Sequence, residues 1–191
     1  MEFLQRITEE TAVRGKHEKI KNESLQTAET KKKYRATLLR LLLLVVVVIV
    51  LVLNLFTHVF RVVHYYGESM EPALHDRQIL VVHKTDKVGS GDIVAFYYNN
   101  KVLVRRVIAE GGSSVEIEDN GTVIVDGRTL EEPYVEEATL GQCNISFPCN
   151  VPFEEFFVMG DNRPISMDSR LEEIGTVPQD RVLGKVLFHF G

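Results

Sequence analysis

The feature that most constrains this chain is an apolar run from Leu41 to Phe60, LLLLVVVVIVLVLNLFTHVF, which contains no Asp, Glu, Lys or Arg. A helix needs about 20 apolar residues to cross the ~30 Å hydrocarbon core of a bilayer. A buried strand does not explain the run, because strands rarely exceed about 10 residues. A cleavable signal peptide fits poorly, since about 40 mostly polar residues precede the run and no small-x-small site closes it. We therefore expect one transmembrane helix over residues 37–60.

The charge on either side of this run predicts its direction. Residues 1–40 hold 10 Lys and Arg against 6 Asp and Glu, whereas the remaining residues hold 12 against 21. Basic residues next to a span stay cytoplasmic, so we expect a cell-membrane protein with a cytoplasmic N-terminus and lipid as a partner. Residues 1–36 contain few large apolar side chains and are expected to form a disordered basic tail. The acidic outer part argues against nucleic acid as a partner.

Beyond residue 76 the chain alternates short apolar runs with turn signals, which is typical of a mainly β fold. The dipeptides Asn99-Asn100, Asn120-Gly121 and Asp126-Gly127 suit tight hairpins. We expect a β-rich extracytoplasmic domain over residues 61–191. Its predicted strands cover residues 78–83, 92–98, 102–108, 115–119, 122–126, 155–159 and 182–189.

Two polar segments are candidates for chemistry. In Gly67-Glu68-Ser69-Met70-Glu71-Pro72, a glycine and a proline flank Ser69 and predict an irregular loop near the membrane. By itself this loop favours an ordinary turn serine, because a nucleophile needs a base and oxyanion donors. The second segment, 160-GDNRPISMDSR-170, follows an apolar strand and is rich in hydrogen-bonding groups. A solvated loop with local turns is the alternative there.

The two cysteines, Cys143 and Cys149, frame the short loop NISFP on the predicted outer side of the membrane. Disulfides persist in that environment, so we expect the two to be paired. Two thiols without a CxxC motif are too few for a structural zinc site, and we expect no metal.

The order of these segments resembles the type I signal peptidases of bacteria. The span is followed by GESMEPALHDRQILVV, GDIVAFYYNNKVLVRRVIA, NGTVIVDGRTLEEPYV and MGDNRPISMDSR, so the resemblance covers residues 37–191. It implies a membrane-bound serine endopeptidase of β-rich fold that removes signal peptides from exported preproteins after small-x-small sites, without a cofactor. Some members also carry a spaced cysteine pair like this one.

The resemblance also implies roles for individual residues. Ser69 matches the nucleophile, and Met70 matches a neighbour that shapes the substrate site. Ser166 matches a serine that supports the base, and Asp168 and Arg170 match a salt-linked pair with the same purpose. The family's GDNR corresponds to Gly160, Asp161, Asn162 and Arg163.

One position departs from the family pattern. The family places a lysine base at the start of a lysine-arginine-aliphatic-aliphatic strand motif, and here that place is held by Arg105, in the run Val104-Arg105-Arg106-Val107-Ile108. Arg105 is therefore the second candidate catalytic position. Burial can bring a lysine to its neutral form near pH 7, but arginine stays protonated in proteins. An Arg105 at this place leaves Ser69 without its usual proton acceptor.

Other groups do not obviously replace the lysine. Lys101 lies about 13 Å away along a regular strand, and Arg106 shares the chemical defect of Arg105. His64, five residues before Ser69, is a candidate base. In some relatives the residue two positions before the serine supplies an oxyanion hydroxyl, but here that residue is Gly67, so other donors are required.

Both faces of the strand around the two arginines are apolar, so periodicity does not say which arginine points inward. A buried arginine needs a carboxylate, and Asp168 and Asp161 are the candidates. Three functions remain open at this point: a signal peptidase, a catalytically impaired relative that binds signal-peptide-like segments or assembly partners without cleaving, and a membrane-tethered structural β domain.

Overall fold

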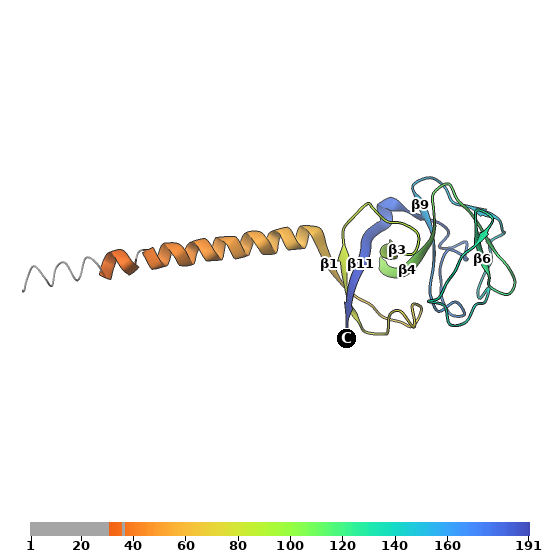
Figure 1. The fold of residues 1–191 in the computed structure, drawn as a ribbon, viewed down its shortest axis with the longest axis horizontal. Coiled ribbons are helices and arrows are strands. Elements are labelled where there is room, and N and C mark those ends of the chain that lie inside the picture. The colour runs from red at the N-terminus through yellow and green to blue at the C-terminus, as the bar shows by residue number, and fades with distance from the viewer. Residues whose placement is uncertain (1–30, 36) are drawn as a thin grey trace, which may run out of the picture. The chain divides into compact units, whose positions relative to one another are not determined.

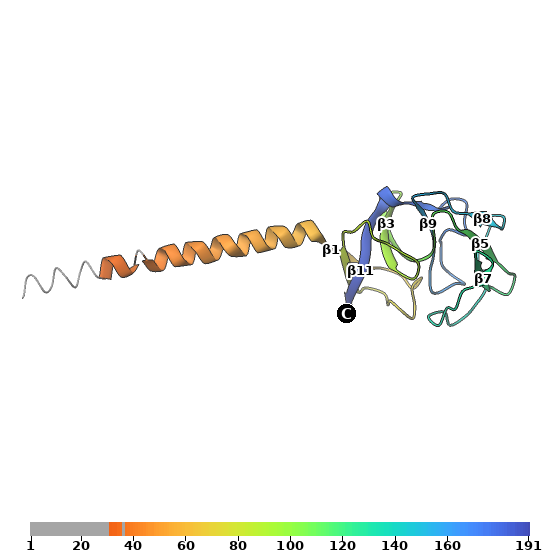
Figure 2. The same cartoon turned by 45° about the horizontal axis from the view of Figure 1, so that its top comes forward.

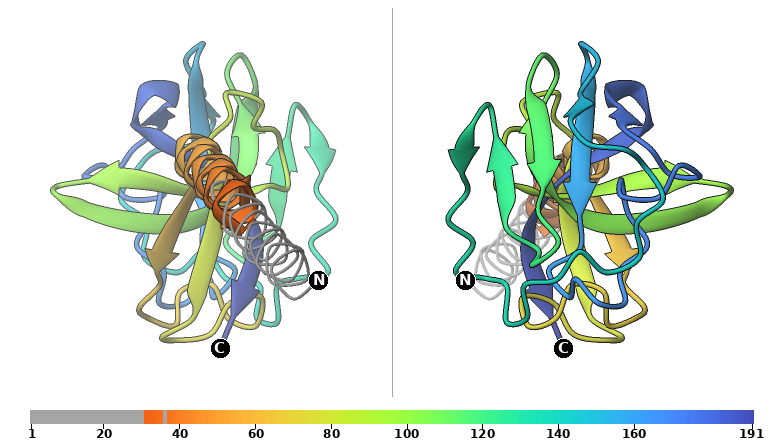
Figure 3. Two further views of the ribbon diagram at one scale, coloured as in Figure 1. Left: turned by 90° about the vertical axis from the view of Figure 1, so that its left-hand side faces the viewer. Right: turned by 90° about the vertical axis from the view of Figure 1, so that its right-hand side faces the viewer.

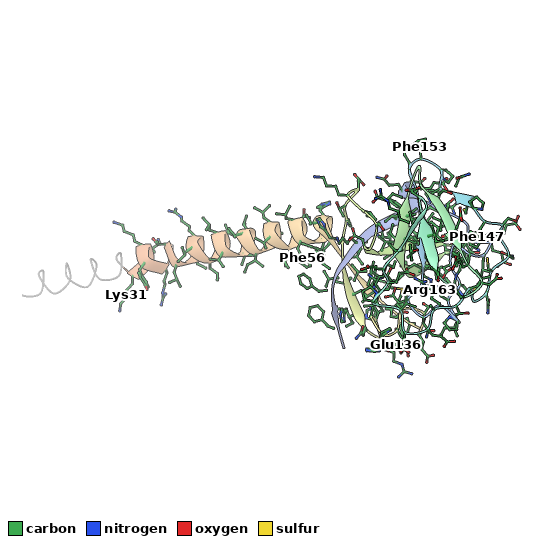
Figure 4. All side chains as sticks on the ribbon, turned by 45° about the vertical axis from the view of Figure 1, so that its right-hand side comes forward. Lys31, Phe56, Glu136, Phe147, Phe153 and Arg163 are labelled. Carbon is green, nitrogen blue, oxygen red and sulfur yellow. The ribbon has the colours of Figure 1, made fainter. Side chains whose placement is uncertain are left out.

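The computed structural model describes residues 31–35 and 37–191, so most of the predicted tail over residues 1–36 lies outside the described residues. A helix covers Lys31–Val59 and, within the described part of the chain, is the one helix long and apolar enough to cross a membrane. Its apolar side chains are exposed all around its axis between Lys31 and Phe56 (Figure 4). Within the described residues this helix includes the predicted span over residues 37–60 up to Val59, together with Lys31 to Arg35 before it.

The chain divides into two compact units, Met1–Leu55 and Phe56–Gly191. The second unit is built from β-strands, which confirms the prediction of a mainly β fold (Figure 1). Its larger sheet has seven antiparallel strands in the order β1-β2-β11-β3-β4-β9-β10. These strands are β1 (Phe60–His64), β2 (Ile79–His83), β11 (Val182–Phe190), β3 (Ile93–Tyr98), β4 (Lys101–Glu110), β9 (Glu155–Met159) and β10 (Val177–Pro178).

A second sheet of four strands has the order β7-β6-β5-β8 and is also antiparallel. It contains β5 (Ser114–Ile117), β6 (Val123–Val125), β7 (Arg128–Thr129) and β8 (Cys149–Asn150). Figure 2 shows β5, β7 and β8 grouped on the side of the domain away from β1 and β11. A short 3-10 helix, η1 (Gln179–Arg181), precedes β11.

All seven predicted strands are present, as β2 to β6, β9 and β11. Two of the predicted tight turns have the left-handed backbone that such hairpins require: Asn99 and Asn100 have φ of 44° and 62°, and Asp126 and Gly127 have φ of 50° and 74°. The first of these turns joins β3 to β4, and this hairpin, drawn in light green, extends to one side of the domain in Figure 3.

The core of the second unit consists of three apolar clusters. One joins the two sheets through Ile108, Val115 and Phe157, and another packs β3, β4 and β9 together around Phe96 and Val158. The third lies beneath the loop between β1 and β2 and contains Tyr65, Met70, Leu74, Leu80, Val82, Ala95 and Val104. This third cluster fixes the position of the loop that carries Ser69.

Candidate active site

The loop from residue 65 to residue 78 presents Ser69 between β1 and β2. Met70 is completely buried, and its carbonyl accepts a 2.8 Å hydrogen bond from Leu74 N–H, which closes one helical turn. The Met70 N–H donates to Tyr65 Oη at 3.1 Å. Ser69 itself is half-buried, so its side chain stays accessible while its neighbours anchor the backbone.

β4 brings Arg105 to this serine. Its Nη1 donates to Ser69 Oγ at 2.8 Å and to its neighbour's carbonyl, Val104 O, at 2.6 Å. Nε and Nη2 both donate to Met167 O, at 2.9 and 2.7 Å. Arg105 is only 5% exposed, and within the described part of the chain no carboxylate forms an ion pair with it. The expected carboxylate partner is thus replaced by carbonyl groups, which satisfy the guanidinium donors without cancelling its charge.

The electrostatic surroundings of Arg105 are mixed. Burial lowers its pKa below the usual range, while the negative charge of Asp168 and the nearby Tyr65 act in the opposite direction. The shift starts from the very high pKa of a guanidinium, so Arg105 remains protonated near neutral pH. The group beside Ser69 Oγ is therefore a cation, which favours a negative charge on that oxygen.

Arg106 points to the other face of β4 and takes the carboxylate partner. It donates to both oxygens of Asp161, at 2.8 and 2.5 Å, and to Gly91 O. Its guanidinium also lies 3.9 Å from the centre of the Tyr134 ring. Burial alone lowers the pKa of Arg106, but the hydrogen bonds and charge of Asp161 outweigh burial and raise it. Asp161, one of the two predicted partners, thus belongs to Arg106 and not to Arg105.

The segment 160–170 follows β9 and folds into a compact, buried loop. Arg170 donates from Nε and Nη2 to the two Asp168 oxygens, both at 2.8 Å, and neither side chain is exposed. The Gly160 N–H donates to Asp168 Oδ2 at 3.0 Å, which closes the loop onto the end of β9. The salt-linked pair that the resemblance implied is therefore formed, and the loop is not a solvated one.

A second buried ion pair holds the same loop to a distant segment. Arg163 donates to both oxygens of Glu132, at 2.9 and 2.5 Å, and to Gly160 O at 3.1 Å. Arg163 is completely buried, whereas Phe153, labelled at the upper edge of the domain in Figure 4, is 84% exposed. Buried charges of this kind require such complete pairing.

The two predicted segments meet at the backbone of Ser69. The Asn162 N–H donates to Ser69 O at 3.1 Å, and Asn162 Nδ2 donates to Glu68 O at 3.1 Å. A Cβ placed on Gly160 would lie 2.4 Å from Ser69 O and 2.2 Å from Ser166 Oγ. The GDNR segment therefore acts as a support that fixes the serine loop, and it requires glycine at its first position.

Ser166 lies next to Gly160, but its side chain takes no part in the hydrogen bonds of the site. Its Oγ is buried and has no hydrogen-bond partner among the residues that the structure describes. The resemblance implied that this serine supports the base. The four side-chain hydrogen bonds of Arg105 go to Ser69, Val104 and Met167, and none of them goes to Ser166.

Tyr65 also belongs to the site, although the sequence did not predict it as a site residue. Its side chain is 4% exposed, and its Oη lies 3.2 Å from Ser69 Oγ. The predicted candidate His64 is the last residue of β1 and is exposed. Neighbouring residues of an extended chain point to opposite sides, so an exposed His64 places Tyr65 inside. Lys101, the other alternative, is the exposed first residue of β4.

The two cysteines and the side chains that could bind a metal are the remaining candidates from the sequence. Cys143 and Cys149 are free cysteines in the structure, so the expected disulfide is not formed there and stays a prediction for the oxidised protein. Burial raises the pKa of the Cys149 thiol, which keeps it protonated. Over residues 31–35 and 37–191, no group of three His, Cys, Asp or Glu side chains is arranged to hold a metal ion.

Taken together, the geometry places one hydroxyl between a buried cation and a buried phenol. Ser69 Oγ accepts a hydrogen bond from Arg105 and shares one with Tyr65, and its backbone is held by Asn162. An oxygen in these surroundings is stabilised as an alkoxide, which suits attack on a carbonyl carbon.

Comparison with known proteins identifies a family with these motifs. Residues 38–190 match the family model described as signal peptidase, peptidase S26. A signal peptidase I T of Bacillus subtilis is 35% identical over 137 residues, covering 65% of this chain and 70% of that protein. A signal peptidase I of Bacillus licheniformis is 39% identical over 137 residues, covering 65% and 73%. A signal peptidase IB of Staphylococcus aureus is 33% identical over 144 residues, covering 65% and 74%.

Among solved structures, a crystal structure of a signal peptidase I from Enterococcus faecalis is 33% identical and covers 53% of this chain and 97% of that chain, with a TM-score of 0.44. The family model covers far more than half of the chain, and the relatives are matched over most of their own length. The resemblance predicted from the motifs is confirmed, and this protein belongs to the signal peptidase family, peptidase S26.

Proposed function

We propose that this protein is a membrane-bound serine endopeptidase that removes signal peptides from exported preproteins after small-x-small sites. The observation that carries this proposal is the position of Ser69. Its Oγ lies 2.8 Å from Arg105 Nη1, and its backbone carbonyl accepts a hydrogen bond from Asn162 of the GDNR segment. The relatives in Bacillus and Staphylococcus are named signal peptidases, which favours this function over a relative that binds without cleaving.

In this function Ser69 is the nucleophile and forms an acyl-enzyme with the residue before the cut. The Ser69 N–H is a candidate oxyanion donor, and Gly67 offers no side-chain hydroxyl as a second one. Arg105 stabilises the alkoxide of Ser69 but cannot take its proton. Met70, Asp161, Asp168, Arg163 and Arg170 are positioning residues, because they pack or hydrogen-bond the loops that hold the site. Ser166 is buried beside them, with no side-chain hydrogen bond to the described residues.

The helix Lys31–Val59 would anchor this activity in the cell membrane, with residues 1–36 on the cytoplasmic side and residues 61–191 outside. The cluster of Lys31, Lys32 and Lys33 at its N-terminal end supports this direction. Exported preproteins reach the outer surface of the membrane, so a peptidase domain on that side meets its substrates where they emerge.

The test is cleavage of a peptide with an Ala-x-Ala site by the full chain in detergent. We expect the natural chain to cleave, and we expect Ser69→Ala to lose at least about a thousandfold in kcat/KM. The matched control is Ser146→Ala, because Ser146 is an exposed serine in another loop. If the natural chain is inactive and Arg105→Lys is active, the protein is a relative that binds without cleaving, and the proposal is wrong.

A further inference from the structure

We propose that Tyr65, as a phenolate, is the general base that takes the proton of Ser69 in place of the missing lysine. This inference rests on the proposed function, since it concerns the same serine. It assigns a chemical role to a residue that lies outside both candidate segments of the sequence, residues 67–72 and 160–170, and that no charge or spacing pattern indicated.

The hydrogen bonds around the two hydroxyl groups leave few ways to place the protons. Arg105 has only donors, so it donates to Ser69 Oγ, and the Met70 N–H likewise donates to Tyr65 Oη. The remaining contact is between Tyr65 Oη and Ser69 Oγ, at 3.2 Å. When Tyr65 is ionised, the Ser69 hydroxyl is the donor in this contact, and its proton already points at the acceptor.

A cation and a backbone N–H donor lie close to Tyr65. Arg105 from β4 is a buried cation whose hydrogen bonds go to carbonyl groups and to Ser69, so no hydrogen-bonded carboxylate neutralises it. The backbone N–H of Met70 adds a donor at the phenol oxygen. Behind Arg105 lie Asp168 and Arg170, which are ion-paired with each other.

Tyr65 belongs to an apolar cluster whose other members come from its own loop and from strands of the larger sheet, among them Met70, Leu80 and Val104. In surroundings of low polarity the attraction between Arg105 and a phenolate is stronger than in water. Arg105 and Tyr65 thus form a pair in which the arginine, unable to serve as a base, stabilises a neighbour that can.

The Tyr65 phenolate takes the proton of Ser69 Oγ while Oγ forms a bond to the scissile carbonyl carbon, and the carbonyl π electrons move onto its oxygen. When the tetrahedral intermediate collapses, the C–N bond breaks and the Tyr65 hydroxyl gives its proton to the leaving nitrogen. Water then attacks the acyl-enzyme and gives a proton to Tyr65, which passes it to Ser69 Oγ as the ester bond breaks.

The chain offers no better placed acceptor among its described residues. His64 is exposed on the opposite side of the chain, and Lys101 is exposed at the far end of β4. Arg106 points to Asp161 and is a cation itself. Within residues 31–35 and 37–191, only Tyr65 brings an ionisable oxygen within hydrogen-bond distance of Ser69 Oγ.

The experiment compares four forms of the full chain on the same peptide: natural, Tyr65→Phe, Arg105→Lys, and the double variant. A general base contributes about 10²–10⁴-fold, so Tyr65→Phe is expected to lose at least a hundredfold in kcat/KM. In the Arg105→Lys background a lysine can act as base, and the same substitution is expected to cost less than about tenfold. The control is Tyr66→Phe, since Tyr66 is the adjacent tyrosine and is 73% exposed.

A phenol is mostly protonated at neutral pH, so the natural chain should become more active as the pH rises from 7 to 10. A difluorotyrosine at position 65 preserves the shape of the side chain but is more acidic, and it is expected to move the rising limb toward neutral pH. An unmoved limb overturns the inference, as does a Tyr65→Phe variant that is fully active or equally impaired in both backgrounds. An inactive natural chain instead disproves the proposed function, so the two failures are distinct.

Discussion

Gly160 shows how little room the residues behind Ser69 leave. A Cβ there would stand 2.4 Å from Ser69 O and 2.2 Å from Ser166 Oγ, well inside van der Waals contact. Gly160→Ala must therefore push the serine loop away from β9. We expect a loss of at least about a hundredfold in kcat/KM, because a shift near 1 Å costs that much, and a loss of about 1–3 kcal/mol in the free energy of unfolding.

Peptide cleavage and urea unfolding measure the two effects. The control is Gly89→Ala, where the nearest atom to an added Cβ is a carboxylate oxygen of the flexible Glu110 side chain, at 3.2 Å. A Gly160→Ala variant as active as the Gly89→Ala variant would show that the serine loop does not depend on this contact.

At this scale the sequence predicted Ser69, the GDNR segment and the Asp168–Arg170 pair, but not the environment of the arginines. The apolar residues on both faces of β4 left the direction of Arg105 and Arg106 open, and only the pairing of β4 with β3 and β9 decides it. Tyr65 was not predicted as a site residue, because the sequence does not distinguish it from a tyrosine that packs in the hydrophobic core. Its proposed role depends on Ser69, which it shares with Arg105, a residue 40 positions further along the chain.

Among the elements, the loop 160–170 after β9 is stabilised by a buried ion pair, and breaking this pair should lower the free energy of unfolding substantially. Asp168→Asn leaves the Arg170 guanidinium, which is not exposed at all, without its anion. Removing one partner of a buried pair typically costs about 3–5 kcal/mol. We expect a fall of that size in the free energy of unfolding, measured by urea denaturation.

The matched control is Glu71→Gln, which changes a 3.6 Å contact between Glu71 and His75, whose side chains are 40% and 63% exposed respectively. Exposed pairs contribute at most about 1 kcal/mol, so this variant should unfold close to the natural midpoint. Equal midpoints for Asp168→Asn and Glu71→Gln would contradict the structural role of the buried pair.

The elements that the sequence did not predict have identifiable reasons. β1 follows the helix directly and shares Phe60 with the apolar run, so no turn signal marks where the strand begins. It is defined by pairing with β2, for example Val62 with Val81. β7, β8 and β10 have two residues each, which is too short for a periodic pattern to appear.

At the scale of the whole molecule, the charge asymmetry around the helix predicts a direction in the membrane. Lys31, Lys32 and Lys33 lie at its N-terminal end, and Arg61 lies just beyond its other end. Because basic residues resist translocation, the excess on the N-terminal side should keep residues 1–36 in the cytoplasm.

In cells stripped of their wall, added protease should digest residues 61–191 and leave an N-terminal tag intact. Replacing all three lysines by glutamine should expose the tag in a fraction of molecules, whereas the same change at Lys84, Lys87 and Lys101 should not. An N-terminal tag that is digested in the natural chain would mean that the peptidase domain faces the cytoplasm, where it could not meet preproteins emerging at the outer surface.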